Sequence, residues 1–215
     1  MSDKKIRFSE VFWLFIFASL IGVILEGLYC LIKFGVWETH VVSIYGHFCI
    51  IYGFGVIFYY IFNHYFKEKN YIIKFFAYAF LGTFVELVCG IVLDKGLDMY
   101  AWSYHHSFLN YHGYICLFMF IVWGIFGIVF EKFTPQLEKL LAKTRTKLWN
   151  LVLPYFLVFM IFNFTLTGIC IVRWAQRHKG HEARNSFERY IDKKYDDKYM
   201  SKRFLDWHFL DELDK

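Results

Sequence analysis

Five long apolar stretches constrain the fold of this chain more than any other feature of its sequence. They cover residues 10–33, 41–66, 72–93, 113–130 and 151–172. Each is close to the roughly 20 residues that an α-helix needs to cross the hydrocarbon core of a bilayer. The whole chain is 58% hydrophobic, whereas soluble domains average about 45–50%. We therefore predict an all-α, polytopic membrane helical bundle with about five transmembrane helices.

The distribution of Lys and Arg predicts the orientation of these helices. Basic residues precede the first stretch and cluster in the connections after the second and fourth, whereas the connections after the first and third hold only Lys95. Because short basic connections stay in the cytoplasm, the N-terminus is predicted to be cytoplasmic and residues 94–112 external. An odd number of spans places the charged, aromatic and partly helical tail (173–215) outside. The tail is rich in Lys and Arg, so its side stays open.

Two glutamates interrupt the apolar stretches at matching places. Glu26 follows Gly22 in the first stretch and Glu86 follows Gly82 in the third, four residues apart in each case. A carboxyl group at the bilayer centre costs about 2.5–3.5 kcal/mol to insert, so it is usually functional. Glycine on the same helix face allows a neighbouring backbone to approach. We predict that both glutamates converge on one outward-biased cavity; the alternative is that they only fix the packing of the bundle.

The second and fourth stretches open on a further match. Tyr45-Gly46-His47-Phe48-Cys49 resembles His112-Gly113-Tyr114-Ile115-Cys116, and we expect Gly46 and Gly113 to open their helices. Two matches in the same order predict a parallel repeat of two helical hairpins, and transporters often place their sites between such repeats. The predicted division is a transmembrane bundle (1–172) made of 10–66, 72–130 and 151–172, followed by the tail (173–215).

Polar and aromatic side chains near the predicted outer ends of the helices complete the candidate site. Besides the two glutamates, the candidate ligand-binding or translocation residues are Tyr45, His47, Trp102, Tyr104, Asn110 and His112. His105 and His106 are weak candidates for a metal site because imidazole binds zinc and copper. They lack the ligand spacing of zinc sites, so we expect no metal and no cofactor.

Several classes of function are excluded by missing motifs. The sequence has no P-loop, no His-Glu-x-x-His and no Gly-x-Ser-x-Gly, so nucleotide hydrolysis would need a separate ATPase subunit. Its basic residues flank apolar stretches instead of forming one stripe, which argues against a nucleic-acid partner. None of the five cysteines forms Cys-x-x-Cys, which argues against a disulfide framework or a zinc ribbon.

The pattern of these residues resembles the type IV, CmpB-like family of bacterial membrane proteins described as ABC-transporter permeases. That family has a glutamate in the first span, Tyr-Gly-Pro-x-Cys-Pro-x-Tyr-Gly, a second glutamate, Trp-Asp-Tyr-Ser and Asn-x-Asn-Gly-Arg-x-Cys-Leu. The matching positions are Glu26, Tyr45, Gly46, Cys49, Tyr52, Gly53, Glu86, Trp102, Tyr104, Asn110, Gly113, Cys116 and Leu117, with Arg173, Arg177, Gly180, Asn185 and Asp192 in the tail. The resemblance implies a multi-pass protein of the bacterial cell membrane.

The chain departs from the family pattern where the family carries prolines or polar groups. The departures are His47 and Ile50 for the two prolines, Ser103 for the loop aspartate, His112 for the second asparagine, Tyr114 for the arginine and Asn163 for an aspartate in the fifth span. Several charges are thus replaced by neutral or titratable groups. If those charges bind a ligand in the family, this chain binds a different ligand or none.

The repeat and the resemblance favour a small permease or permease-like subunit, with lipid around it and a separate ATPase subunit or a second copy as partner. One alternative is a membrane enzyme that acts on a lipid headgroup or another interfacial substrate, with Glu26 or Glu86 as general base. Another is a structural or sensory membrane protein. Transport requires access from both sides, yet the inner halves of the first three stretches are nearly free of polar residues.

Overall fold

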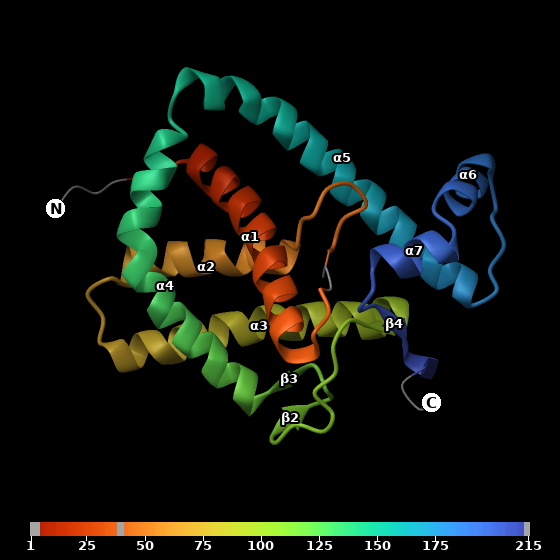
Figure 1. Ribbon diagram of the computed structural model, residues 1–215, viewed down its shortest axis with the longest axis horizontal. Helices are drawn as coiled ribbons and strands as arrows, with labels where there is room; N and C mark the ends of the chain where they lie inside the picture. Colours follow the sequence, from red (N-terminus) through yellow and green to blue (C-terminus); the bar gives the residue numbers. More distant parts are fainter. Residues whose placement is uncertain (1–4, 38–40, 213–215) are drawn as a thin grey trace.

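The computed structural model describes residues 5–37 and 41–212, which are mostly helical, as predicted. The five long helices are α1 (Phe8–Phe34), α2 (Ile50–Phe66), α3 (Tyr71–Leu97), α4 (Leu117–Lys143) and α5 (Lys147–His178) (Figure 1). The tail holds α6 (Ser186–Lys194), α7 (Asp197–Arg203) and the 3-10 turn η1 (Leu210–Glu212). Four two-residue strands, β1 (Met99–Tyr100), β2 (Asn110–Tyr111), β3 (Ile115–Cys116) and β4 (His208–Phe209), form two small antiparallel ladders.

Four of these helices, α1, α3, α4 and α5, are long and apolar enough to cross a membrane. The chain is therefore a multi-pass membrane protein. Helix α2 has only 17 residues, about 25 Å at 1.5 Å per residue. That is shorter than a typical span, so the count of five spans stays a prediction.

The predicted starts of α2 and α4 are wrong by several residues. Helix α2 begins at Ile50 instead of residue 41, and α4 begins at Leu117 instead of residue 113. Gly46 and Gly113 adopt left-handed backbone angles, with φ of 75° and 72°, and therefore lie in turns before the helices. Hydropathy does not distinguish an apolar turn from an apolar helix, which explains the error.

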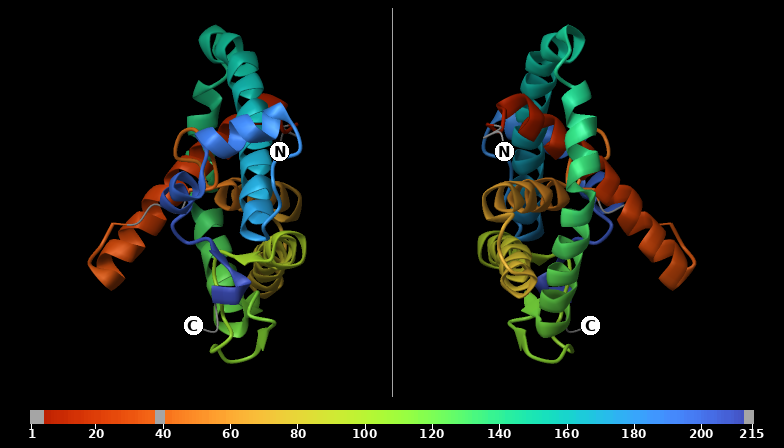
Figure 2. Two further views of the ribbon diagram at one scale, coloured as in Figure 1. Left: turned by 90° about the vertical axis from the view of Figure 1, so that its right-hand side faces the viewer. Right: turned by 90° about the vertical axis from the view of Figure 1, so that its left-hand side faces the viewer.

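The two ends of the molecule are held by different sets of contacts. At one end, Arg145 donates to the buried carboxylate of Glu10, and Lys74 forms a 2.6 Å ion pair with Glu131. At the other end, a buried apolar cluster joins the segment before α2, β1, the end of α5 and the tail through Ile44, Met99, Trp174, Met200 and Phe209. Side views show the C-terminal part of α1 projecting away from the other helices (Figure 2).

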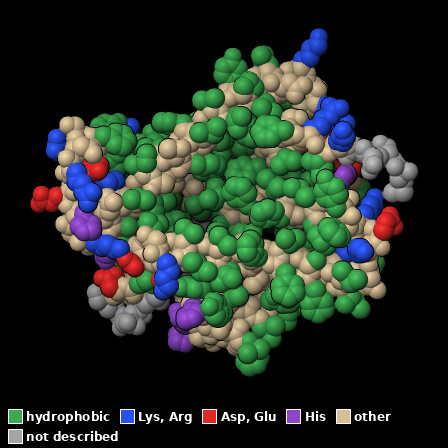
Figure 3. Space-filling model, turned by 180° about the vertical axis from the view of Figure 1, so that it is seen from behind, with side chains coloured by type: hydrophobic (Ala, Val, Ile, Leu, Met, Phe, Trp, Pro, Cys, Tyr) green, Lys and Arg blue, Asp and Glu red, His purple; other side chains and the backbone are tan. Residues whose placement is uncertain are grey.

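A broad apolar surface separates two charged ends of the molecule (Figure 3). Large hydrophobic side chains, such as Ile32 and Phe118, are exposed in the structure. Exposed apolar area on this scale is typical of a lipid-facing surface.

The tail docks on the loops at its end of the molecule. Strand β4 pairs with β1, with Met99 opposite Phe209. Arg203 donates a 2.8 Å hydrogen bond to the carbonyl of Ser43 and another to that of Gly46. The tail is thus packed against the two connections that precede α2 and α4, a contact that positions part of the site.

Candidate functional site

A cavity of about 410 Å³ lies among α1, the start of α2, α3, the start of α4 and the end of the tail. Both intramembrane glutamates line it, Glu26 from α1 and Glu86 from α3. Trp102 and Tyr104, from the connection after β1, line it as well. The structure therefore brings together four of the residues that the sequence singled out, from two separate hairpins.

Glu86 is the most buried acidic group of this cavity, with 5% of its surface exposed. Its Oε1 accepts a 3.0 Å hydrogen bond from the hydroxyl of Tyr104. Trp123 of α4 also interacts with the carboxyl group, yet neither the indole nitrogen nor Oε2 of Glu86 completes a hydrogen bond among the described residues. Glu86 therefore lines the cavity with one oxygen bonded to Tyr104 and the other buried without a hydrogen-bond partner among the described residues.

Glu26 is half-buried, one turn after Gly22 on the same face of α1. A Cβ atom at Gly22 would lie 2.4 Å from the ring of Tyr52 in α2. A Cβ atom at Gly82, one turn before Glu86, would likewise lie 2.5 Å from the ring of Trp123. Both rings line the cavity. Each glycine therefore makes room for an aromatic side chain of the cavity wall, whereas we expected it to allow a neighbouring backbone to approach.

The tail supplies two further lining residues, Asp206 and Trp207. Sequence reasoning missed both because their place depends on the docking of β4 against β1. Cys49 and Cys89 also line the cavity.

Two of the predicted residues, Tyr45 and Asn110, shape the surrounding loops. The side chain of Asn163 brackets Tyr45, accepting from its backbone nitrogen at 3.0 Å and donating to its carbonyl at 2.8 Å. The Tyr45 hydroxyl lies 2.8 Å from that of Tyr195 in the tail. Asn110 closes the turn before β3 by accepting from the nitrogen of Gly113 at 3.2 Å. Neither side chain lines the cavity.

The histidines lie outside the cavity, on the surface of the same end of the molecule. His47, His105, His106 and His112 are all exposed. In the described parts of the chain, no group of three His, Cys, Asp or Glu side chains is placed to hold a metal ion.

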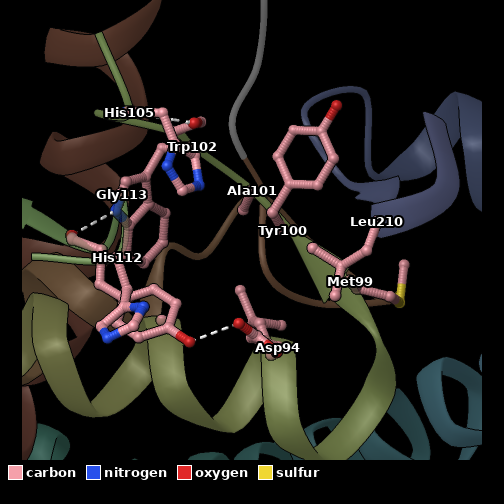
Figure 4. A pocket seen from close by; sticks show the side chains of 13 residues that line it. Asp94, Met99, Tyr100, Ala101, Trp102, His105, His112, Gly113 and Leu210 are labelled. Carbon is pink, nitrogen blue, oxygen red and sulfur yellow. Dashed lines mark hydrogen bonds between the residues drawn. The ribbon is translucent and has the colours of Figure 1, made fainter. Parts of the chain in front are cut away.

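A smaller pocket of about 30 Å³ adjoins the cavity and shares Trp102 with it (Figure 4). Here the hydroxyl of Tyr114 donates to Asp94, which raises the pKa of Tyr114 above its ordinary value. The indole of Trp102 donates a 2.9 Å hydrogen bond to the carbonyl of Tyr114. Through these two hydrogen bonds Tyr114 holds Trp102, which is also a wall of the larger cavity. Tyr114 stands where the family pattern has an arginine, so a neutral side chain fills this position.

Comparison with known proteins gives one match. A family described as "Putative ABC-transporter type IV" matches residues 13–168. The match includes Glu26, Glu86, Trp102 and Tyr104 and stops before the tail. No curated protein and no solved structure shows significant similarity to the chain. The chain belongs to the ABC-transporter type IV family, as its motifs predicted.

Proposed function

We propose that the chain is a small integral membrane permease or permease-like subunit whose ligand binds in the cavity between Glu26 and Glu86. The observation that supports this proposal is that both glutamates line one open volume. Carboxyl groups in membrane spans usually mark ligand or ion pathways. The family description agrees with a transport role.

The hairpins α1–α2 and α3–α4 form a parallel repeat under this proposal. Cys49 and Cys116 are the N-cap residues of α2 and α4. Gly46 and Gly113, each three residues earlier, share the left-handed backbone conformation. Together with the two glycine–aromatic contacts, these features support equivalent positions for the glutamates on either side of a repeat interface.

All five long helices, α2 included, then cross the membrane. The backbone nitrogen of Cys49, just before α2, bonds to Ser19 near the middle of α1, so α2 starts below the loop surface. Near its other end, Asn63 donates to Thr134 of α4 at 3.0 Å. A recessed start explains why a helix of 17 residues suffices, and the basic connections 67–70 and 144–146 then face the cytoplasm.

An ATPase subunit or a second copy of this chain is the expected partner. No P-loop is present in the sequence, so this chain cannot supply ATP hydrolysis by that route. The predicted cytoplasmic end, which holds the Glu10–Arg145 and Lys74–Glu131 pairs, is the surface that such a subunit would meet.

A membrane enzyme for a lipid headgroup is the second candidate. The observation that favours it is that the polar lining, including Tyr104 and Asp206, comes from one end of the molecule. A neighbouring void between α2, α3 and α4 is lined mainly by apolar residues such as Ile51, Val56 and Val85. Access from one side suffices for an interfacial enzyme, whereas a transporter must open the other side in a second conformation.

The proposal is tested by replacing each glutamate with glutamine and with leucine. Glutamine keeps the shape and hydrogen bonding of the side chain but cannot ionise. We expect Glu26→Gln and Glu86→Gln to abolish complementation of a deletion strain while membrane abundance and thermal stability stay near wild type. Wild-type complementation by both, with loss only in the leucine variants, would show that the glutamates are structural. Glu182→Gln, in the exposed tail, is the control for net charge.

A further inference from the structure

We infer that the cavity binds an organic cation with an apolar body, such as an aryl- or alkylammonium group. This inference rests on the proposed function, because it names the ligand class of the same site. Three properties of the cavity carry the inference: the charge of its lining, the aromatic residues in its walls and its volume.

The ionisable lining is acidic. Glu26, Glu86 and Asp206 line the cavity from α1, α3 and the tail. Among the described residues that line it, none is Lys, Arg or His. An anion entering this space would meet the like charge of these carboxylates, and low dielectric strengthens that repulsion. A cation would instead stabilise the ionised carboxylates.

The aromatic lining suits a cation of low charge density. Tyr52, Trp102, Tyr104, Trp123 and Trp207 come from four separate segments and all contribute to the walls. The face of an aromatic ring attracts a cation, and cages of such rings are the usual way in which proteins bind quaternary ammonium groups.

An inorganic metal ion fits the same lining poorly. Hard cations take six or more oxygen ligands, and soft ones take clustered His or Cys side chains. No such cluster of three or more ligands occurs in the described chain. The remaining walls are largely aliphatic, with Val88 and Val92 of α3 and Met119 of α4 among them. They provide a surface for the apolar part of an organic ion.

The size of the cavity agrees with a small organic ligand. Its volume of about 410 Å³ falls in the range of about 300–1,000 Å³ that small-molecule sites occupy. The carboxyl group of Glu86, whose Oε2 is buried without a hydrogen-bond partner among the described residues, places negative charge in the cavity wall. A free organic cation and the ammonium headgroup of a lipid share this chemistry.

The inference is tested by calorimetric titration of the full chain in nanodiscs of the uncharged lipid digalactosyldiacylglycerol, so that the membrane surface attracts neither the cation nor the anion. The probe is benzyltrimethylammonium, and the controls are its neutral isostere neopentylbenzene and the anion benzenesulfonate. We expect the cation to bind at least tenfold more tightly than either control. Equal binding of the isostere, or tighter binding of the sulfonate, would overturn the inference without requiring any variant.

Variants then place the probe in the cavity. We expect Glu86→Gln and Trp102→Leu each to weaken binding of the cation at least fivefold and to leave binding of the isostere unchanged. Glu182→Gln should leave both unchanged. Wild-type affinity of both cavity variants, with melting temperatures that show folded protein, would overturn the assignment to this cavity.

A second titration, in phosphatidylcholine nanodiscs, separates the two sources of the ligand. A severalfold rise in the apparent Kd of the probe would assign the site to the lipid headgroup, and an unchanged Kd would assign it to a free cation. Failure of the cation to bind, with loss of complementation in both glutamine variants, would refute the ligand class alone. If the cation binds but both glutamine variants complement fully, the permease role is refuted while the cation-binding site is supported.

Discussion

The hydroxyl of Tyr104 donates a hydrogen bond that joins the loop after β1 to the buried carboxyl group of Glu86 in α3. We expect Tyr104→Phe to lower the free energy of unfolding by about 1–3 kcal/mol, because it leaves a buried acceptor unsatisfied. Tyr111→Phe is the control, since its side chain is exposed and should change stability by less than about 0.5 kcal/mol. Thermal unfolding in detergent micelles measures both. Equal changes in the free energy of unfolding of the two variants would show that the 3.0 Å hydrogen bond does not stabilise the protein.

At the same scale, the sequence was informative for some site residues and silent for others. Glu26 and Glu86 stand out because carboxyl groups inside apolar stretches are rare. Asp206 and Trp207 do not, because nothing local distinguishes a tail residue that docks from one that is solvated. Tyr45 and Asn110 matched the family motif equally well, yet they shape loops around the site. A shared motif does not separate a lining residue from a supporting one.

Helix packing depends on the two glycines that precede the glutamates. A methyl group at Gly22 would lie 2.4 Å from Tyr52, whereas one at Gly55, in α2, would meet nothing within 4 Å. Overpacking costs about 1–3 kcal/mol, and replacing a helical glycine with alanine gains up to about 1 kcal/mol. We therefore expect Gly22→Ala to destabilise the protein by about 1–2 kcal/mol and Gly55→Ala to stabilise it slightly. Unfolding of both variants in micelles checks this, and equal shifts would contradict the contact between α1 and α2.

The short helix α6 is tied to α5 by Asp192. Its carboxylate pairs with Arg173 at 2.6 Å and with Arg177 at 2.6 Å. Burial alone would raise the pKa of Asp192, but these hydrogen bonds outweigh it and hold the pKa below its ordinary value. Asp197 also pairs with Arg177 but is mostly exposed. The two aspartates therefore offer a matched comparison.

We expect Asp192→Asn to destabilise the docked tail by about 2–3 kcal/mol at neutral pH, and Asp197→Asn by less than about 1 kcal/mol. Because the pKa of Asp192 is lowered on folding, its stabilising effect is full above the unfolded value of about 3.9. It disappears as the pH falls through the lower folded value. Limited proteolysis of the tail between pH 7 and pH 3 measures this. A gap between wild type and Asp192→Asn that does not narrow between pH 7 and pH 3 would contradict the ion pairs.

The existence and type of the long helices followed from hydropathy, while the starts of α2 and α4 did not. Residues 41–49 and 113–116 are as apolar as the helices they precede, and only the left-handed glycines and the β2–β3 ladder reveal turns there. Sequence alone also gave no sign that β1 would pair with β4 across more than a hundred residues, because two-residue strands carry no periodic pattern.

For the molecule as a whole, the tail and the loop after β1 must share one side of the membrane, since β1 pairs with β4. We expect single cysteines at His105 and Asp211, in a background without the native cysteines, to react with an impermeant maleimide on intact cells. A cysteine at Lys69 should react only after the cells are opened. Labelling of Lys69 but not His105 on intact cells would invert the topology, and labelling of His105 without Asp211 would contradict the docked tail.

The central claim is that Glu26 and Glu86 act in one joint site, and a double-mutant cycle tests it most directly. Complementation, or transport once a substrate is known, is measured for Glu26→Gln, Glu86→Gln and the double variant, each at matched membrane abundance. Groups that act as a unit are strongly non-additive. We therefore expect each single variant to lose as much activity as the double variant loses. Wild-type activity in both single variants, or losses that multiply in the double variant, would contradict a joint site.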